Sequence, residues 1–182
     1  MLNQKHTLVA LVQDKPGVLN RVASLFRRRG FNIESITVGH TEMPGISRMT
    51  LTVAGDHAQV EQVRKQLEKL IDVVKVTDIT EESMVARELA LIKVKTTPAT
   101  RAEIIQVVDV FRANIVDVAP DSVIVEVTGD EDKIESLFNL LRGFGVKELA
   151  RGGRLAMSRG GTGPLPVETE EAAPRRRKKG VG

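Results

Sequence analysis

The sequence contains no cysteine, tryptophan or tyrosine, and its aromatic residues are five phenylalanines. Without cysteine the chain can form no disulfide, thiol nucleophile or thiolate zinc site, which fits a reducing cytoplasm. The histidines, His6, His40 and His57, lie far apart without metal-ligand spacing, so we expect no metal site. No apolar run approaches the roughly 18 residues that span a bilayer, and the N-terminus lacks a signal-peptide pattern. We therefore expect a cytoplasmic protein without a membrane contact.

Catalytic signatures are also missing. The sequence has no Gly-x-Ser-x-Gly elbow, no Walker-type phosphate loop and no dinucleotide fingerprint. The acidic pairs Glu81-Glu82 and Glu170-Glu171 lie in polar connectors, where they are most simply solvated charges. We expect no catalytic residue in this chain.

The basic character of the chain comes from one short run. Lys and Arg total 27 against 24 acidic residues, but five of these bases form the run Arg175 to Lys179, and without it 22 basic residues face 24 acidic ones. The basicity therefore belongs to a tail and not to a face of the fold. We interpret the run as a solubilising tail, with contact to an acidic partner as the alternative.

Residues 7–34 have the pattern of a strand, a tight loop, an amphipathic helix and the start of a second strand. Thr7 to Val12 is a β-rich apolar run, and apolar residues then recur at helical spacing from Val18 up to Gly30, which is placed to end the helix. The loop between them is Asp14-Lys15-Pro16-Gly17. Its proline fixes φ and its glycine lacks a Cβ, so the backbone can approach a small molecule.

This loop has the chemistry of an amino-acid site. The N–H groups that open the helix have no intrahelical partner and form an anion site suited to a carboxylate. Asp14 can pair with an ammonium group, and Asn32, at the start of the next strand, offers a donor and an acceptor. Together these groups suit an α-amino acid. The alternative is that Asp14, Pro16 and Gly17 only shape a turn.

The first part of the chain predicts the order strand, helix, strand, strand, helix, strand. Met43-Pro44-Gly45 marks the turn of a hairpin. Asp56 is expected to cap the second helix, with Gln59 completing a capping box, and Val73 to Ile79 supplies the last strand. The buried stripe expected for this helix is Val60, Val63, Leu67, Leu70 and Ile71.

The same order follows a polar connector at residues 81–87. We expect a strand over Glu88 to Lys95, a helix that starts at Thr97-Pro98, a hairpin, a helix over Asp130 to Arg142 and a last strand. The buried residues expected for these helices are Ile104, Ile105, Val107, Val108 and Phe111, and then Ile134, Leu137, Phe138, Leu140 and Leu141. Thr96-Thr97-Pro98-Ala99 lacks the carboxylate and glycine of the first loop, so ligand binding is assigned to the first unit.

The sequence thus predicts an α+β fold of two tandem ferredoxin-like βαββαβ units, at residues 5–80 and 88–152, each with both helices on one face of a four-stranded antiparallel sheet. Hydroxyl-bearing residues on the other face of the first sheet form a polar surface that can accept another subunit. RNA-recognition domains share this order of elements, but residues 47–53 carry no aromatic for base stacking, so we expect no nucleic acid. Residues 153–182 are expected to be a largely disordered tail.

Four segments resemble the ACT domain of the acetolactate synthase small-subunit family: D-K-P-G-V-L from Asp14, R-R-G-F-N-I-E-S from Arg28, S-R-M-T from Ser47 and K-Q-L-E-K-L-I-D-V-V-K-V from Lys65. The second unit and S-R-G at Ser158 to Gly160 also resemble this family. The resemblance covers about residues 5–160.

The resemblance implies a non-catalytic regulatory subunit that binds a large catalytic subunit. Thiamine diphosphate, Mg and FAD are expected in that partner and no cofactor in this chain. Valine, or another branched-chain amino acid, is expected to bind between two ACT domains of a homodimer. The site residues implied are Asp14, Gly17, Val18, Asn32 and Ile33. The alternative is a stand-alone amino-acid-sensing ACT protein that controls another enzyme or regulator.

Overall fold

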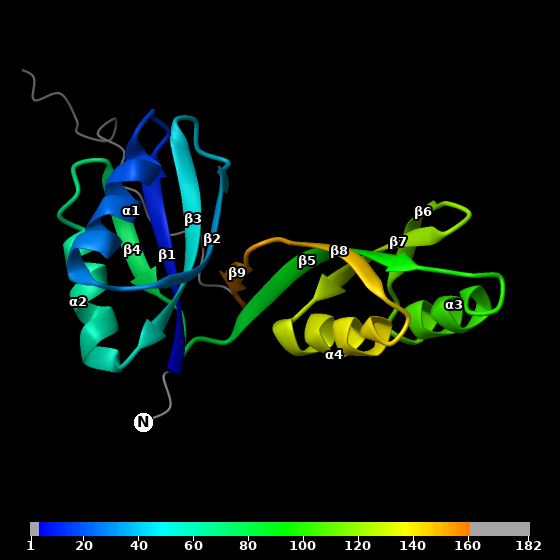
Figure 1. Ribbon diagram of the computed structural model, residues 1–182. Coiled ribbons are helices and arrows are strands. Elements are labelled where there is room, and N and C mark those ends of the chain that lie inside the picture. Colours follow the sequence, from blue (N-terminus) through cyan, green and yellow to red (C-terminus); the bar gives the residue numbers. More distant parts are fainter. Residues whose placement is uncertain (1–3, 161–182) are drawn as a thin grey trace, which may run out of the picture.

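The computed structural model describes residues 4–160, which form two βαββαβ units joined by a long strand (Figure 1). The first unit consists of β1 (Gln4–Gln13), α1 (Val18–Arg29), β2 (Ile33–His40), β3 (Ile46–Gly55), α2 (His57–Leu67) and β4 (Val73–Asp78). The second consists of β5 (Met84–Lys95), α3 (Arg101–Val110), β6 (Asn114–Val118), β7 (Ser122–Gly129), α4 (Glu131–Arg142) and β8 (Val146–Arg151), and a short strand β9 (Leu155–Ser158) follows. The predicted α+β fold of two tandem ferredoxin-like units is confirmed.

The first sheet has the strand order β2-β3-β1-β4, and α1 and α2 cover one of its faces (Figure 1). Alternate residues of β1 point toward the helices, where they meet the apolar stripes of α1 and α2. The buried side chains of this core include Leu8, Ala10, Val12, Val22, Phe26, Met49, Leu51, Val53, Val60, Val63 and Leu67. Burial of large apolar side chains of this kind stabilises a fold by about 1.5–3 kcal/mol each.

The expected helix ends of the first unit are mostly confirmed. Gly30 caps α1 in the left-handed conformation with φ 70°, and Asp56 and Gln59 form the expected capping box at α2. The stripe predicted to run to Ile71 is wrong at its end. Helix α2 stops at Leu67, and two turns reverse the chain before β4, so Ile71 leaves the helical phase and is 87% exposed.

The second sheet has the strand order β6-β7-β5-β8, with α3 and α4 on one face (Figure 1). Its core is built from Ala90, Ile92, Val94, Ile104, Val108, Val123, Val125, Val127, Ile134, Leu137 and Leu141. Two residues expected in the core are not there: Ile105 is 40% exposed and Leu140 is 53% exposed. Each lies next to a fully buried residue on its helix, at the border of the apolar stripe, where a position one residue on turns about 100° away.

The start of α3 agrees with the prediction in part. Helix α3 runs from Arg101 with Thr100 as N-cap, but the turn before it already has helical bonding, since the Arg101 N–H donates to the Thr97 carbonyl at 3.0 Å. The backbone N–H of Thr97 and that of Thr100 each donate to the other's hydroxyl, at 3.0 and 3.3 Å. These are the reciprocal bonds of a capping box, so Thr97 and Pro98 lie at the start of a turn that leads into α3.

The boundaries between the two units differ from the prediction more strongly than the helix ends do. The connector expected at 81–87 belongs in part to β5, whose first four residues, Met84 to Arg87, pair with β9. Strand β9 lies within the stretch expected to be disordered, so that expectation is wrong for 155–158, and residues 161–182 lie outside the described residues. The two paired segments are about 70 residues apart in sequence, and among the described residues β9 pairs with β5 alone. Figure 1 shows the long β5 running from the first unit into the second.

The returning segment lies across the open face of the first sheet. We call residues 152–158 the strap; they lead from β8 into β9. On the strap, Ala156 is 5% exposed and packs with Val9 of β1 and Ile79, while Met84 and Ala86 of β5 complete the cluster. The face that the sequence left open for another subunit is therefore covered in part by this chain.

We predict that Ala156→Asp detaches the strap, because it places an unpaired carboxylate against Val9 and Ile79. The expected loss in free energy of unfolding is about 1–3 kcal/mol, measured by urea denaturation. Leu155→Asp is the matched control. Leu155 is the next residue on β9 but is 62% exposed, so its substitution should cost about 0.5 kcal/mol or less. Equal losses for the two variants would contradict this packing.

Candidate functional site

The loop between β1 and α1 has the geometry of a small anion site. Gly17 caps α1 with φ 87°, in the left-handed region that favours glycine, and no atom lies within 4 Å of the place a Cβ would take. The first helical bond of α1 runs from the Arg21 N–H to the Gly17 carbonyl at 3.0 Å, so the N–H groups before it precede the helical ladder. The space beside Gly17 is therefore open, and it lies at the N-terminus of a 12-residue helix, which is the positive end of the helix dipole.

The loop is held from both sides. The Asp14 N–H donates to the Gly45 carbonyl at 2.8 Å, and the Gln13 N–H donates to the Asp72 carbonyl at 2.8 Å. The carboxylate of Asp72, a buried residue, also pairs with Arg21 on α1. Three contacts therefore fix the loop relative to the sheet and the helix, so a ligand would meet a preformed site.

The carboxylate of Asp14 is accessible. Its side chain is 47% exposed and lies 3.3 Å from Nδ1 of His40, at the end of β2. Val18, by contrast, is buried in the core, so its side chain cannot reach a ligand, and its backbone N–H donates to the Lys15 carbonyl at 3.4 Å.

Asn32 and Ile33 lie at the other end of the sheet. The register places Ile33 beside Val53 and His6, near the start of β1, whereas His40 pairs with Ser47 beside Val12, near its end. Because a strand rises about 3.3 Å per residue, the eight-residue β2 separates Asn32 from the Asp14 loop by roughly 25 Å. One chain thus brings Asp14, Gly17 and Val18 together but does not bring Asn32 or Ile33 to them.

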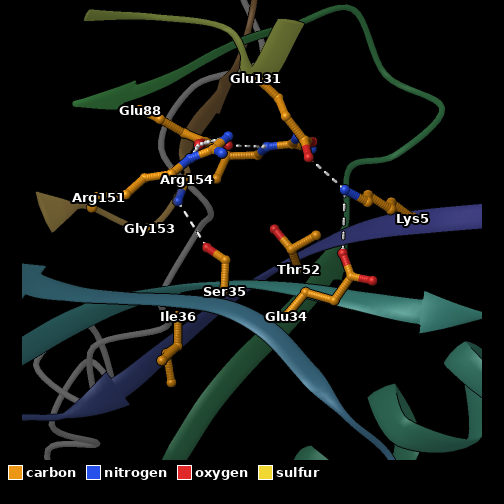
Figure 2. A pocket seen from close by; sticks show the side chains of 11 residues that line it. Lys5, Glu34, Ser35, Ile36, Thr52, Glu88, Glu131, Arg151, Gly153 and Arg154 are labelled. Atoms are coloured by element: carbon orange, nitrogen blue, oxygen red, sulfur yellow. Dashed lines mark hydrogen bonds and ion pairs between the residues drawn. The ribbon is translucent and has the colours of Figure 1, made fainter. Parts of the chain in front are cut away.

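A second polar region lies where the two units meet. A cavity of about 430 Å³ opens there, between the first sheet on one side and β5, α4 and the strap on the other (Figure 2). One ion pair crosses this seam, since Lys5 of β1 lies 2.6 Å from Glu131 of α4. Lys5 also lies 3.4 Å from Glu34 on β2 of its own sheet. Arg154 of the strap reaches the same Glu131 at 3.0 Å.

The buried charge of the seam is Glu88, the fifth residue of β5, which is 8% exposed. Arg151 contacts its carboxylate with Nε at 2.9 Å and Nη2 at 2.8 Å, and Nε of Arg154 lies 3.7 Å away. Two guanidinium groups thus compensate a carboxylate that would otherwise be costly to bury.

The charges of the seam affect one another's pKa values. The hydrogen bond from Lys5 holds the pKa of the Glu131 carboxyl below its ordinary value, and the same bond raises the pKa of Lys5. Both groups are therefore charged across the neutral range, and the pair holds β1 to α4.

Sequence reasoning missed this seam. In the sequence, Lys5, Glu88 and Glu131 cannot be told from ordinary surface charges. Ion pairs between two units that are about 80 residues apart leave no pattern in the neighbouring sequence. Gly152-Gly153 was the one available clue, since adjacent glycines permit close backbone approach, but they do not reveal what they approach.

Residues 4–160 contain no helix of the length and hydropathy needed to cross a bilayer. They also hold no group of three or more His, Asp or Glu side chains placed to bind a metal ion.

Comparisons with known proteins give a consistent result. Residues 8–75 match the family model of the AHAS small subunit-like ACT domain, and residues 87–160 match that of the small subunit of acetolactate synthase. The chain is 60% identical over 156 residues to the probable acetolactate synthase small subunit of Archaeoglobus fulgidus, covering 86% of this chain and 98% of that protein. It is 54% identical over 158 residues to the acetolactate synthase small subunit of Bacillus subtilis, covering 86% and 91%.

A solved structure agrees. The crystal structure of the acetolactate synthase small subunit from Thermotoga maritima aligns with a TM-score of 0.81 at 47% identity. The alignment covers 87% of this chain and 99% of that one, so it includes both units.

The pKa shifts of the seam generate a prediction. Glu131→Gln should lower the free energy of unfolding at pH 7 by about 1 kcal/mol or less, because both partners of the pair are more than one third exposed. A carboxyl whose pKa is lowered in the folded state stabilises above its unfolded pKa, near 4.5, and loses this contribution as the pH falls through the folded value. The difference between variant and wild type should therefore shrink below pH 4.5 and in high salt.

Asp132→Asn is the matched control for this prediction, since Asp132 is the neighbouring acid on α4 and is exposed. Urea denaturation at pH 7 and pH 3, in low and high salt, measures both variants. A Glu131→Gln effect of the same size at both pH values would show that the ion pair does not carry it.

Proposed function

Because the chain belongs to the acetolactate synthase small-subunit family, we propose that it is the regulatory subunit of acetolactate synthase. In this role it activates a catalytic subunit dependent on thiamine diphosphate and makes that enzyme sensitive to feedback inhibition by valine in branched-chain amino-acid synthesis. The observation that carries the proposal is the 60% identity to an acetolactate synthase small subunit over 98% of that protein. Catalysis and its cofactors, thiamine diphosphate, Mg and FAD, then belong to the cytoplasmic partner.

The loop between β1 and α1 supports an amino-acid effector. The first turn of α1, beside Gly17, has N–H groups that precede the helical hydrogen-bond ladder, and a carboxylate there would be stabilised by the helix dipole. Asp14 supplies a negative charge on the same loop for an ammonium group. The two ends of an α-amino acid thus have matching groups, and its side chain is left to select the effector.

The positions of Asn32 and Ile33 favour a site shared by two chains. Strand β2 is an edge of its sheet, and in residues 4–160 it pairs with β3 alone. If two copies pair through their β2 edges in antiparallel fashion, the start of each β2 comes to the end of the other, close to the partner's loop. Asn32 and Ile33 of one copy then approach the loop of the other, and a homodimer has two such sites.

Inhibition follows from linkage. An effector shifts the subunit toward a less activating state only to the extent that it binds that state more tightly. Coupling of about 1–3 kcal/mol is typical of such regulation, whereas a micromolar ligand has about 8 kcal/mol of binding free energy. A small share of the binding free energy, used differentially, is therefore enough.

The direct test is calorimetric titration of valine, leucine and isoleucine into the purified chain, followed by assay with the catalytic subunit. We expect saturable heat with valine at one ligand per chain, or one-half if the two sites of a dimer exclude each other, and valine-inhibited acetolactate formation by the complex. The absence of both heat and inhibition would refute the proposal. Co-purification with a different partner enzyme would favour a stand-alone amino-acid sensor instead.

Gly17→Asp should abolish valine inhibition and leave activation largely intact. The new carboxylate would occupy the open space at the helix start, repel the effector's carboxylate, and strain a backbone with φ 87°. The assay compares activity of the complex with and without saturating valine. Inhibition of the variant at the wild-type valine concentration would show that the effector binds elsewhere.

A further inference from the structure

The strap is hydrogen-bonded to strand β2. The backbone N–H of Arg154 donates to Oγ of Ser35 at 2.8 Å, and the hydroxyl of Thr37 donates to the carbonyl of Arg154 at 2.9 Å. Ser35 and Thr37 are alternate residues of β2, so both point to the same face of the sheet. Figure 2 shows Ser35 directed toward the strap. The strap is thereby bound to β2 at two successive positions.

The contact at Gly153 is too close for any side chain. A Cβ at this position would lie 2.8 Å from Oγ of Ser35, 2.8 Å from Cγ2 of Thr37 and 2.9 Å from the Ile36 carbonyl oxygen. The last of these atoms is backbone and cannot rotate away. Gly153 is therefore required by the close approach of two backbones, and a change in β2 at this point must move the strap.

The other side of the strap is bound to the second unit. The N–H of Gly152 donates to the Leu89 carbonyl on β5 at 2.8 Å, and Arg154 pairs with Glu131 at the start of α4. Three consecutive residues, 152–154, thus touch β2 on one side and β5 and α4 on the other. The strap therefore connects the two units, in addition to β5 and the Lys5–Glu131 ion pair.

We propose that Gly153 and Arg154 are positioning residues that couple β2 to the second unit, so that effector binding on β2 is transmitted through the strap. This rests on the proposed function, because β2 begins at Ile33, beside Asn32, and both are effector-site candidates. Ser35, held by the strap, is two residues from Ile33 along the same strand. A displacement of Ile33, at the start of β2, therefore has to pass along only two residues of the strand before it moves Ser35 and with it the strap.

The test uses the full chain reconstituted with its catalytic subunit. Gly153→Ala forces the strap away from β2, and Ser35→Ala combined with Thr37→Val removes both hydrogen bonds without adding bulk. For each variant, calorimetry gives the valine Kd of the small subunit, and the assay gives the activity of the complex without valine and at saturating valine.

Two substitutions serve as controls. Gly143→Ala introduces the same change where a Cβ makes only an ordinary 3.5 Å contact. Thr50→Val removes a hydroxyl on the same face of the sheet. This hydroxyl has no hydrogen-bond partner, so the strap contacts stay intact. Both controls should behave as wild type.

We expect both strap variants to bind valine within about threefold of the wild-type Kd while losing at least half of the inhibition seen at saturation. A structural defect in the effector site would instead raise the Kd and leave the inhibition at saturation unchanged. Full inhibition at saturating valine in both variants, or a loss of valine binding in both, would overturn the proposal. A wild-type chain that binds no valine and is not inhibited would refute the proposed function itself, which keeps the two failures apart.

Discussion

A four-stranded sheet with both helices on one side leaves its second face uncovered, and the way this chain covers that face determines the rest of its organisation. The strap and the first part of β5 lie over the first sheet, where Ala156 packs on Val9 and Ile79. The connection between the units is consequently a packed seam and not a flexible linker. Lys5, Glu88 and Glu131 carry the ion pairs of that seam, and Gly153 sets how closely the backbones approach.

The sequence of β1 contained a sign of this arrangement. Leu8 to Val12 is a continuous apolar run, and all five residues are buried, as is typical of a strand covered on both faces. From Glu88 onward β5 alternates instead, with Ala90, Ile92 and Val94 buried and Leu89 and Leu91 exposed, because its second face is open there. The difference between the two central strands could thus be read from the chain, although the covering segment could not.

Local chemistry accounts for what was predictable elsewhere. The capping box at Asp56 and the left-handed Gly30 depend on residues within a few positions, so their signals are complete in the sequence. Ile71 and Leu140 were misplaced because apolar periodicity continues past the point where a turn or the border of a stripe ends burial. Strand β9 was missed because its pairing partner lies in another unit, and strand formation at that distance is a tertiary effect.

The candidate site likewise has one part that local sequence predicts and one part that depends on the topology of the fold. The loop from Asp14 to Gly17 is a local feature, so its place between β1 and α1 was predictable from the sequence. The separation of Asn32 from this loop follows from topology, since β1 and β2 are both antiparallel to β3 and therefore run in the same direction. A helix that connects two strands of the same direction must return the chain to the starting end of the sheet. The predicted βαββαβ order already implied that one chain could not close the site.

If the site is shared between two copies, effector binding and pairing of the β2 edges are thermodynamically linked. A ligand that contacts both chains stabilises the dimer by the same factor by which dimer formation strengthens ligand binding. Strand β2 would then be held on three sides: by its partner strand in the dimer, by β3, and by the strap at Ser35 and Thr37. An edge strand normally moves independently of distant elements, but one bound in this way cannot shift without moving the strap. The same strand that would complete the effector site is thus attached through the strap to the second unit.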